Sequence, residues 1–241
     1  MNAGLSVVVP CYNEEKTIKT LLEMVLNQSS VFEVIVVDDG STDSSAKVIL
    51  GMTNPKIKFL QNEKNLGKGK TVSRGLKAST GDFVLIQDAD LEYDPREYQK
   101  LLQPLIDDKG DVVFGSRFLT STSRRVLYYW HRLGNNLLTT MSNVFTNIDL
   151  TDMETCYKVM RKEIAHCLDI QENRFGIEPE MTAKFAAMGV RIFEVPISYN
   201  GRTYEEGKKI GWKDGFSAIR CIIKYNLPSA KKAQLNKWKS I

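Results

Sequence analysis

The 241-residue sequence has few of the residues and motifs that identify several common classes of enzyme. It has only two histidines, His131 and His166, and their spacing fits neither a metal site nor a catalytic triad. It has no G-x-S-x-G motif, which excludes the corresponding serine hydrolases. Its four cysteines are scattered and form no C-x-x-C pair, so we expect reduced thiols in the cytosol.

Long apolar runs and a secretory leader are also lacking. No uninterrupted apolar run approaches the roughly 18 residues of a membrane-spanning helix. The best candidate, residues 126–148, is broken by His131, Arg132 and several amides and hydroxyls. Residues 1–4 run directly into a strand pattern, which leaves no room for a signal peptide. We therefore expect a cytoplasmic protein that, if it acts at a membrane, is peripheral at the cytoplasmic face.

Two nucleotide-binding motifs are missing or incomplete. No G-x-G-x-x-G follows the first apolar segment, which argues against a dinucleotide-dependent dehydrogenase. The segment Gly67-Lys68-Gly69-Lys70-Thr71 resembles the end of a phosphate loop, but Lys64 stands where a Walker motif needs glycine. We reject an ATPase loop, although free amides at a glycine-rich helix start, together with Lys68, favour a diphosphate.

The net charge of +4 is concentrated in one segment. Residues 229–241 contain four lysines and no acid, so the rest of the chain is neutral. A nucleic-acid-binding protein would show a wider basic surface, and we expect no nucleic-acid partner. This basic tail is interpreted either as a solvated, frayed terminus or as a weak attachment to anionic lipid, with Trp238 as an interfacial ring.

The first half of the sequence alternates between apolar strand patterns and helical patterns. We expect strands at residues 5–10, 33–37, 56–60, 82–87 and 111–114. Helices are expected at 14–27, about 42–50, 68–78 and 95–107. Such alternation predicts an α/β fold with a mostly parallel sheet and helices on both faces.

The pattern changes after residue 115. We expect helices at 126–145, at 178–188 and from about 212, a strand at 190–195, and irregular or extended chain at 152–160. The last helix has a stripe of Trp212, Phe216, Ile219 and Ile223, which is interpreted as facing the core, with a membrane-facing stripe as the alternative. The simplest division is one domain over residues 1–228 with a C-terminal amphipathic helical elaboration, followed by the tail.

Two acidic turns follow apolar strands in the first ninety residues. Asp88-Ala89-Asp90 can direct two carboxylates at one small volume, and such oxygens suit Mg²⁺ or Mn²⁺ shared with substrate phosphates. The alternative is a pair of solvated loop acids. In the other turn, Asp39 can accept the imino hydrogen of a base and Gly40 allows close backbone approach. The alternative there is turn and helix-cap chemistry.

Other candidate site residues lie at the ends of the first and fifth strands and in a late loop. After the first strand, Tyr12 can stack on a base and Glu14 can contact a ribose, unless this segment only caps the next helix. Arg117 and Arg202 lie beside glycines in loops at the predicted edge of the site, and guanidinium groups bind phosphate bidentately.

Taken together, these motifs resemble family 2 glycosyltransferases of the GT-A (Rossmann-like) fold. The resemblance rests on V-V-P-x-Y-N-E, V-D-D-G-S-T-D, N-x-G-K-G and D-A-D-L, in family order over residues 5–118. The segments 88–95, 115–118 and 201–209 resemble more narrowly the polyprenyl-phosphate branch, which includes dolichyl-phosphate mannose and glucose synthases. This looser resemblance extends to about residue 227.

The resemblance implies a role for each matching residue. Residues 1–118 would form the nucleotide-sugar and metal half, and residues 119–228 the acceptor half. Asp88 and Asp90 would hold the metal and diphosphate, with Asp90 as the direct ligand. The remaining residues would bind the nucleoside and its phosphates (Pro10, Tyr12, Glu14, Asp39 and Lys68) or the acceptor phosphate (Arg117 and Arg202, with Arg132 as a further candidate).

The predicted activity is inverting, metal-dependent transfer of a hexose from a nucleoside diphosphate sugar to a polyprenyl phosphate. The branch resemblance favours UDP-glucose as donor, and GDP-mannose is the other candidate. Glu92 stands where some mannose synthases have Gln, which leaves the donor and the metal coordination open. One alternative is transfer to a sugar or lipid hydroxyl, with Asp152, Glu154 or Glu180 as base. Another is a non-catalytic subunit that binds nucleotide sugars. Membrane attachment would come from amphipathic helices or from a separate integral membrane protein.

Overall fold

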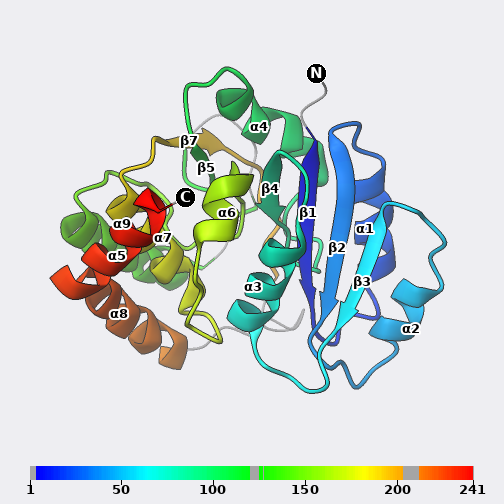
Figure 1. Cartoon of the computed structure of the whole chain (residues 1–241). Helices are drawn as coiled ribbons and strands as arrows, with labels where there is room; N and C mark the ends of the chain where they lie inside the picture. The colour runs from blue at the N-terminus through cyan, green and yellow to red at the C-terminus, as the bar shows by residue number, and fades with distance from the viewer. Residues whose placement is uncertain (1–3, 120–124, 127, 203–211, 241) are drawn as a thin grey trace.

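A seven-stranded sheet organises the described part of the computed structural model, which covers residues 4–119, 125–126, 128–202 and 212–240 (Figure 1). Six of these strands are parallel, and β6 runs antiparallel to both of its neighbours. The spatial order is β3 (Ile57–Gln61), β2 (Val31–Asp38), β1 (Leu5–Cys11), β4 (Phe83–Ile86), β6 (Lys158–Arg161), β5 (Val112–Ser116) and β7 (Ile192–Pro196). The predicted mostly parallel sheet is confirmed.

Helices cover both faces of the sheet, and this explains why its central strands are apolar on both sides. One face carries α3 (Lys68–Ala78) and α6 (Lys162–Cys167), while the other carries α1 (Ile18–Leu26), η1 (Pro95–Glu97) and α4 (Tyr98–Ile106). Strands buried on both faces read as continuous apolar runs. Gly75 allows α3 to approach β1, because a Cβ there would lie 2.3 Å from Cγ1 of Val8.

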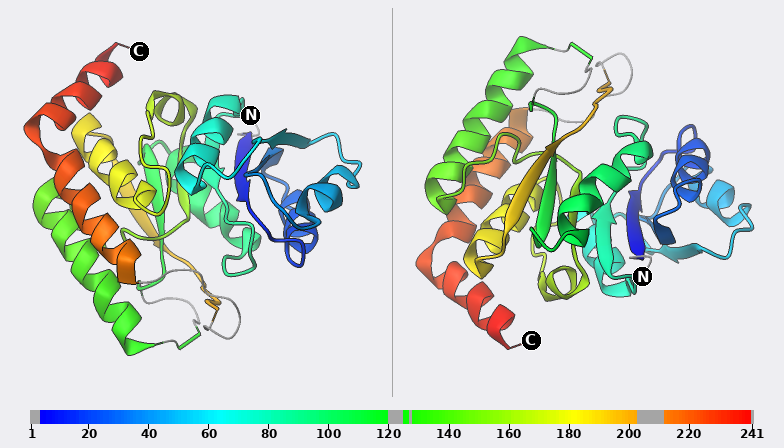
Figure 2. Two further views of the ribbon diagram at one scale, coloured as in Figure 1. Left: turned by 90° about the horizontal axis from the view of Figure 1, so that it is seen from below. Right: turned by 90° about the horizontal axis from the view of Figure 1, so that it is seen from above.

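Four helices form a further layer beside the later strands. They are α5 (Tyr129–Thr146), α7 (Ile177–Met188), α8 (Trp212–Asn226) and α9 (Pro228–Lys239). Both views in Figure 2 place α5, α8 and α9 on the outside of the molecule, with α7 between them and the sheet. The short helix α2 (Ser45–Leu50) lies at the opposite end beside β3 (Figure 1).

The last two helices differ from the sequence prediction. Residues 228–239 form α9, so the frayed-terminus interpretation is wrong over this range. Trp238 packs against the core, and Gln234 donates a hydrogen bond to Sγ of Cys167, because α9 lies against α6 and α7. On α8 the buried face is Ala218, Cys221, Ile222 and Tyr225. Phe216 and Ile223 of the predicted core stripe are exposed, and the side chain of Trp212 lies outside the described part.

The reversed strand β6 matters most for the site. Lys158 of β6 pairs with Phe114 near the end of β5, and Arg161 pairs with Phe83 at the start of β4. The chain therefore enters β6 at the edge where the parallel strands end. As a result, residues 152–157 join the loops that follow β1, β2, β4 and β5, which is where open α/β sheets bind ligands.

Candidate active site

Most of the predicted site residues lie in loops along the carboxyl edge of the sheet. Tyr12 and Glu14 follow β1, Asp39 follows β2, and the acidic turn 88–90 follows β4. Pro10 lies near the end of β1, and Arg117 directly follows β5. This arrangement follows from the parallel strands, because their carboxyl ends share one edge.

The loops after β1 and β2 are fixed to each other by side-chain hydrogen bonds. Asn13 accepts a bond from the amide of Thr42 at 2.8 Å, and its own amide donates to Oγ of Ser41 at 3.0 Å. The amide of Glu14 donates to Oγ of Ser45 at 2.8 Å. Asn13 thus does not simply cap its own helix. These bonds position Tyr12, which is exposed, and Glu14, which is half-buried.

Asp39 is buried and orders the loop that leads into α3. Its carboxylate accepts hydrogen bonds from the amides of Leu66 and Gly67, at 2.9 and 2.8 Å, and from Nδ2 of Asn62 at 2.8 Å. The predicted free amides of the glycine-rich helix start are wrong at two positions. Gly67 donates to Asp39 and Gly69 donates to the carbonyl of Asn173, because the backbone of residues 172–173 lies against both glycines.

Lys68 points to the acidic turn and joins it to α7. Its ammonium group lies 2.8 Å from Oδ1 of Asp88 and 3.1 Å from Oε1 of Glu178. Glu178 also pairs with Lys158 of β6 at 2.9 Å. Burial favours the neutral form of Lys68, but the charges of Asp88 and Glu178 outweigh it and raise the pKa of Lys68 well above its usual value. Lys68 therefore stays a cation beside the acidic turn.

Asp90 is paired with Arg202, so one of the two predicted acceptor arginines contacts the predicted metal ligand. Nη2 of Arg202 lies 2.6 Å from Oδ2 of Asp90, and its Nε lies 3.0 Å from Oε1 of Glu92. Glu92 also accepts a bond from the Tyr199 hydroxyl at 2.8 Å. Burial, with the charges of Asp88 and Glu92, raises the pKa of Asp90 to about 7 even though Arg202 opposes it. The turn thus has more negative charge than its cations balance.

Arg117 is held in a fixed orientation by Asp152. Two bonds of 2.6 and 2.7 Å join its guanidinium to the fully buried Asp152 carboxylate, and a third of 3.2 Å reaches Oδ1 of Asn135 on α5. The guanidinium also lies over the ring of Tyr199, 5.1 Å from its centre. Arg132 lies nearby, over the ring of Phe118. Residues 203–209 of the motif that begins at Gly201 lie outside the described part.

Sequence reasoning missed two residues of this charge network. Glu178 and Lys158 are buried and paired, yet neither follows a strand end or belongs to a recognised motif. An acidic residue in the first turn of α7 was the available signal for Glu178. Of the three predicted bases, Asp152 is taken by Arg117, and Glu180 is held by the amides of residues 171–172 and by Lys184.

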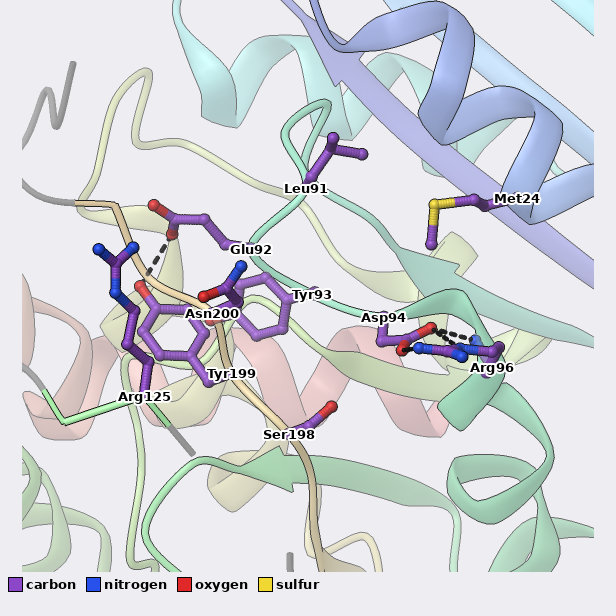
Figure 3. Close-up of a pocket in the computed structure, with 10 residues that line it drawn as sticks. All are labelled: Met24, Leu91, Glu92, Tyr93, Asp94, Arg96, Arg125, Ser198, Tyr199 and Asn200. Atoms are coloured by element: carbon purple, nitrogen blue, oxygen red, sulfur yellow. Dashed lines mark hydrogen bonds and ion pairs between the residues drawn. The ribbon is translucent and has the colours of Figure 1, made fainter. Parts of the chain in front are cut away.

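A cavity of about 470 Å³ opens beside Glu92 and Tyr199 (Figure 3). It lies between the loop that follows β4, residue 24 of α1 and the segment 198–200. Its basic side chains are Arg125, which donates to the carbonyl of Gly201, and Arg96, which is paired with Asp94. The hydrogen-bonded pair of Glu92 and Tyr199 contributes to the lining of this cavity.

The acidic turn fits a divalent cation. Asp88 and Asp90 offer hard oxygen ligands. Each carboxylate is paired with a cationic side chain, Lys68 or Arg202, which shows that positive charge is favourable at this position. Among the described residues, no group of three or more His, Cys, Asp or Glu side chains is arranged to hold a metal ion. Mg²⁺ is often bound by only one or two carboxylates together with substrate phosphates.

Comparison with known proteins decides the family. The model of glycosyl transferase family 2 matches residues 6–169. The chain belongs to this family. Structural comparison confirms the expected GT-A fold: glucosyl-3-phosphoglycerate synthase from Mycobacterium tuberculosis, solved with UDP, superimposes with a TM-score of 0.72 at 21% identity. The match covers 93% of this chain and 80% of that one.

Curated relatives of this family 2 chain come from several organisms. A dolichyl-phosphate beta-glucosyltransferase of Trichomonas vaginalis is 28% identical, covering 80% of this chain and 63% of that protein. The dolichol-phosphate mannosyltransferase of Pyrococcus furiosus is 26% identical, covering 91% and 63%. Glycosyltransferase AglD of Haloferax volcanii is 26% identical, covering 81% and 33%. The chain thus spans between a third and two thirds of the length of these relatives.

Proposed function

We propose that this family 2 chain transfers a hexose from a nucleoside diphosphate sugar to a polyprenyl phosphate, with inversion at the anomeric carbon. The observation that carries the proposal is the 2.6 Å contact between Arg202 and Asp90. It brings the predicted acceptor-binding cation against the predicted metal ligand, so donor diphosphate and acceptor phosphate would meet at one turn. The relatives named for dolichyl-phosphate glucose and mannose transfer support this substrate class.

The donor would lie along the edge formed by residues 1–118. Pro10, Tyr12 and Glu14 would contact the nucleoside, with Asp39 either accepting from the base or ordering the loop beneath it. Lys68 would bind the diphosphate, because its ammonium group already faces the acidic turn at 2.8 Å from Asp88. UDP-glucose is the favoured donor, and UDP is the nucleotide bound by the structurally similar synthase.

Asp88 and Asp90 would hold Mg²⁺ or Mn²⁺ at this turn. When bound, the ion would supply Lewis-acid neutralisation of the charge that develops on the departing diphosphate. Several solved forms of the similar synthase contain Mn²⁺, which supports a divalent ion here. Lys68 would share this role through its positive charge, since its ammonium group stays protonated beside Asp88.

The acceptor half, residues 119–228, would present the phosphate of the lipid to the sugar. A phosphate monoester is ionised at neutral pH, so it needs orientation rather than a strong base. Asp152 fixes the plane of the Arg117 guanidinium, so the group would meet the phosphate in a set orientation. Arg202 would exchange its carboxylate partners for the same phosphate once a metal ion occupies the turn.

Exposed apolar side chains on α5 and α8 support action at a membrane surface. Trp130, Leu137 and Val144 on α5 are more than half exposed, as is Phe216 on α8. In the described part of the chain, no helix has the length and apolarity needed to cross a bilayer. We propose peripheral attachment through these helices, or through a separate integral membrane protein, close to where a polyprenyl chain would enter.

A hydroxyl acceptor is the second candidate, because one unpaired carboxyl near the site could act as a base. Oε1 of Glu154 is buried with no hydrogen-bond partner. Burial and the charge of Glu178 raise the pKa of Glu154 to about 7 despite Lys158 and Arg117. The similar synthase is named for glucosyl-3-phosphoglycerate, so its product contains no polyprenyl phosphate. A non-catalytic subunit would instead bind nucleotide sugars without any transfer.

The proposal is tested with a panel of radiolabelled nucleotide sugars incubated with the protein and membranes. We expect label to enter the organic phase, EDTA to abolish the transfer, and added Mg²⁺ or Mn²⁺ to restore it. A sugar-phosphate-lipid product is released by mild acid, whereas an ordinary glycoside resists it. Transfer at the full rate in metal-free buffer would contradict the metal site, and tight donor binding without transfer would indicate a binding subunit.

A further inference from the structure

Glu154 has a buried carboxyl oxygen that no described protein group satisfies. Buried polar atoms are nearly always hydrogen-bonded, so an unsatisfied oxygen beside a binding site requires an explanation. The neighbouring carboxylates differ, because Asp152 is bonded to Arg117, and Glu194 accepts bonds from the amides of Thr151 and Asp152. Among these three carboxylates, Glu154 is therefore the one with an oxygen that accepts no hydrogen bond.

The position of Glu154 is fixed by bonds on both sides. The Lys158 ammonium group donates to the carbonyls of Met153 and Thr155, the residues that flank Glu154. The hydroxyl of Thr155 donates to the carbonyl of Gly115 at 2.6 Å. The unpaired oxygen is therefore not the result of a loosely held loop, because the backbone around it has defined partners.

Glu154 is influenced by charges that belong to both halves of the charge network. The charges that act on it most strongly belong to Glu178, Lys158, Arg117 and Asp152. Glu178 contacts Lys68, which in turn contacts the acidic turn where the donor diphosphate would bind. Arg117 is a proposed ligand of the acceptor phosphate. A sugar that passes from diphosphate to phosphate must lie between these two groups.

We propose that Glu154 binds a hydroxyl group of the transferred hexose and thereby helps to select the sugar. The inference rests on the proposed function, because it requires a nucleotide sugar at this edge. A sugar hydroxyl is a hydrogen-bond donor of the kind that the buried oxygen lacks. A site that pairs a buried polar group with a substrate hydroxyl discriminates strongly against analogues that lack this hydroxyl.

The test compares the affinities of UDP-glucose and UDP by calorimetry, with GDP-mannose and GDP measured in parallel. For the pair that the wild type binds, the ratio of the two dissociation constants isolates the contribution of the sugar. We expect Glu154→Ala to reduce this contribution by roughly tenfold or more, and Glu154→Gln by less, because an amide oxygen still accepts a hydrogen bond. Glu194→Gln, a matched change in a carboxylate whose oxygens are satisfied, is expected to leave the ratio unchanged.

Deoxy-sugar analogues of the donor identify the hydroxyl. The analogue that lacks the hydroxyl bound by Glu154 is expected to bind wild type and Glu154→Ala equally well, because neither complex can form this hydrogen bond. An unchanged ratio in Glu154→Ala overturns the inference. If that variant keeps the ratio but loses turnover, the residue is a base and the hydroxyl-acceptor alternative is supported. If the wild type binds neither nucleotide sugar, the proposed function fails together with the inference.

Discussion

Replacing Arg202 with alanine is expected to strengthen binding of a divalent cation. The Arg202 guanidinium is paired with Asp90 at 2.6 Å and with Glu92 at 3.0 Å, and a metal ion at this turn would have to displace it. In the variant, both carboxylates keep their charge but lose this competing cation. The prediction tests directly whether the acidic turn is a metal site.

The size of the effect follows from the burial of the three groups. Side chains of Arg202, Asp90 and Glu92 are 26%, 10% and 15% exposed, so solvent screens the pairs only in part. A fully exposed ion pair has an interaction free energy of up to about 1 kcal/mol, and we expect about 1–2 kcal/mol for these partly buried pairs. A metal ion that displaces Arg202 must overcome this interaction. Affinity for Mn²⁺ should therefore rise about five- to thirtyfold.

The assay is titration of the protein with Mn²⁺, followed by the signal of free Mn²⁺ in electron paramagnetic resonance. It is performed at pH 8, because the pKa of Asp90 is about 7 and loss of Arg202 removes a charge that lowers it. Arg96→Ala is the matched control, since it breaks an arginine–aspartate pair at Asp94 away from the turn. Equal or weaker Mn²⁺ binding by Arg202→Ala would refute the competition and the metal site on which it depends.

Three further changes have defined outcomes. Asp39→Ala removes the carboxylate that accepts hydrogen bonds from the backbone amide of Gly67 and the side-chain amide of Asn62. The free energy of unfolding should fall by about 2–4 kcal/mol, which lowers the calorimetric melting temperature by roughly 5–15 °C. An unchanged melting temperature would contradict this role. Asp90→Ala should abolish transfer and Mn²⁺ binding with a wild-type circular dichroism spectrum, and retained turnover would exclude Asp90 as the ligand. Burial raises the pKa of Glu172, but bonds from Lys224, Arg220 and Tyr225 lower it to about 2, so Glu172→Gln should be less stable than wild type in urea at neutral pH. This difference should shrink as the pH falls from about 4.5 towards 2, and a constant difference would show that the pairs do not stabilise the fold.

The sequence predicted the first half of the fold well because local signals and tertiary packing agree there. The strands β1, β2 and β4 are buried on both faces, so each reads as an apolar run. The helix α3 begins at Lys68 and ends at Ala78, as its pattern predicted. Between these elements, turns rich in Asp, Gly and Asn mark the strand ends. The acidic turn 88–90 was recognisable for the same reason.

The second half was harder to predict because its order depends on contacts between distant residues. Strand β6 has only four residues, and one of them is the buried Lys158. The charge of Lys158 can be buried because it pairs with Glu178, twenty positions later in the sequence. Helix α9 is rich in lysine and has no strong apolar stripe, so only its packing through Gln234 and Trp238 reveals it as a structured element.

The candidate site shows the same division. Its residues at strand ends were found from sequence, but the pairing of Asp90 with Arg202 spans 112 positions, and that of Arg117 with Asp152 spans 35. No local pattern encodes such pairs. The unpaired oxygen of Glu154 is likewise visible only when every neighbouring donor has been assigned.

The antiparallel direction of β6 has a consequence for how this scaffold can be engineered. The turn 152–157 reaches the candidate site from its own short strand, while the loops proposed to bind the nucleotide follow β1, β2 and β4. We therefore expect that the stretch from 147 to 157 can be exchanged between family members as a unit, provided that Asp152 still pairs with Arg117 and Lys158 keeps its partner on α7. Chimeras of this kind should inherit sugar preference from the graft and base preference from the host.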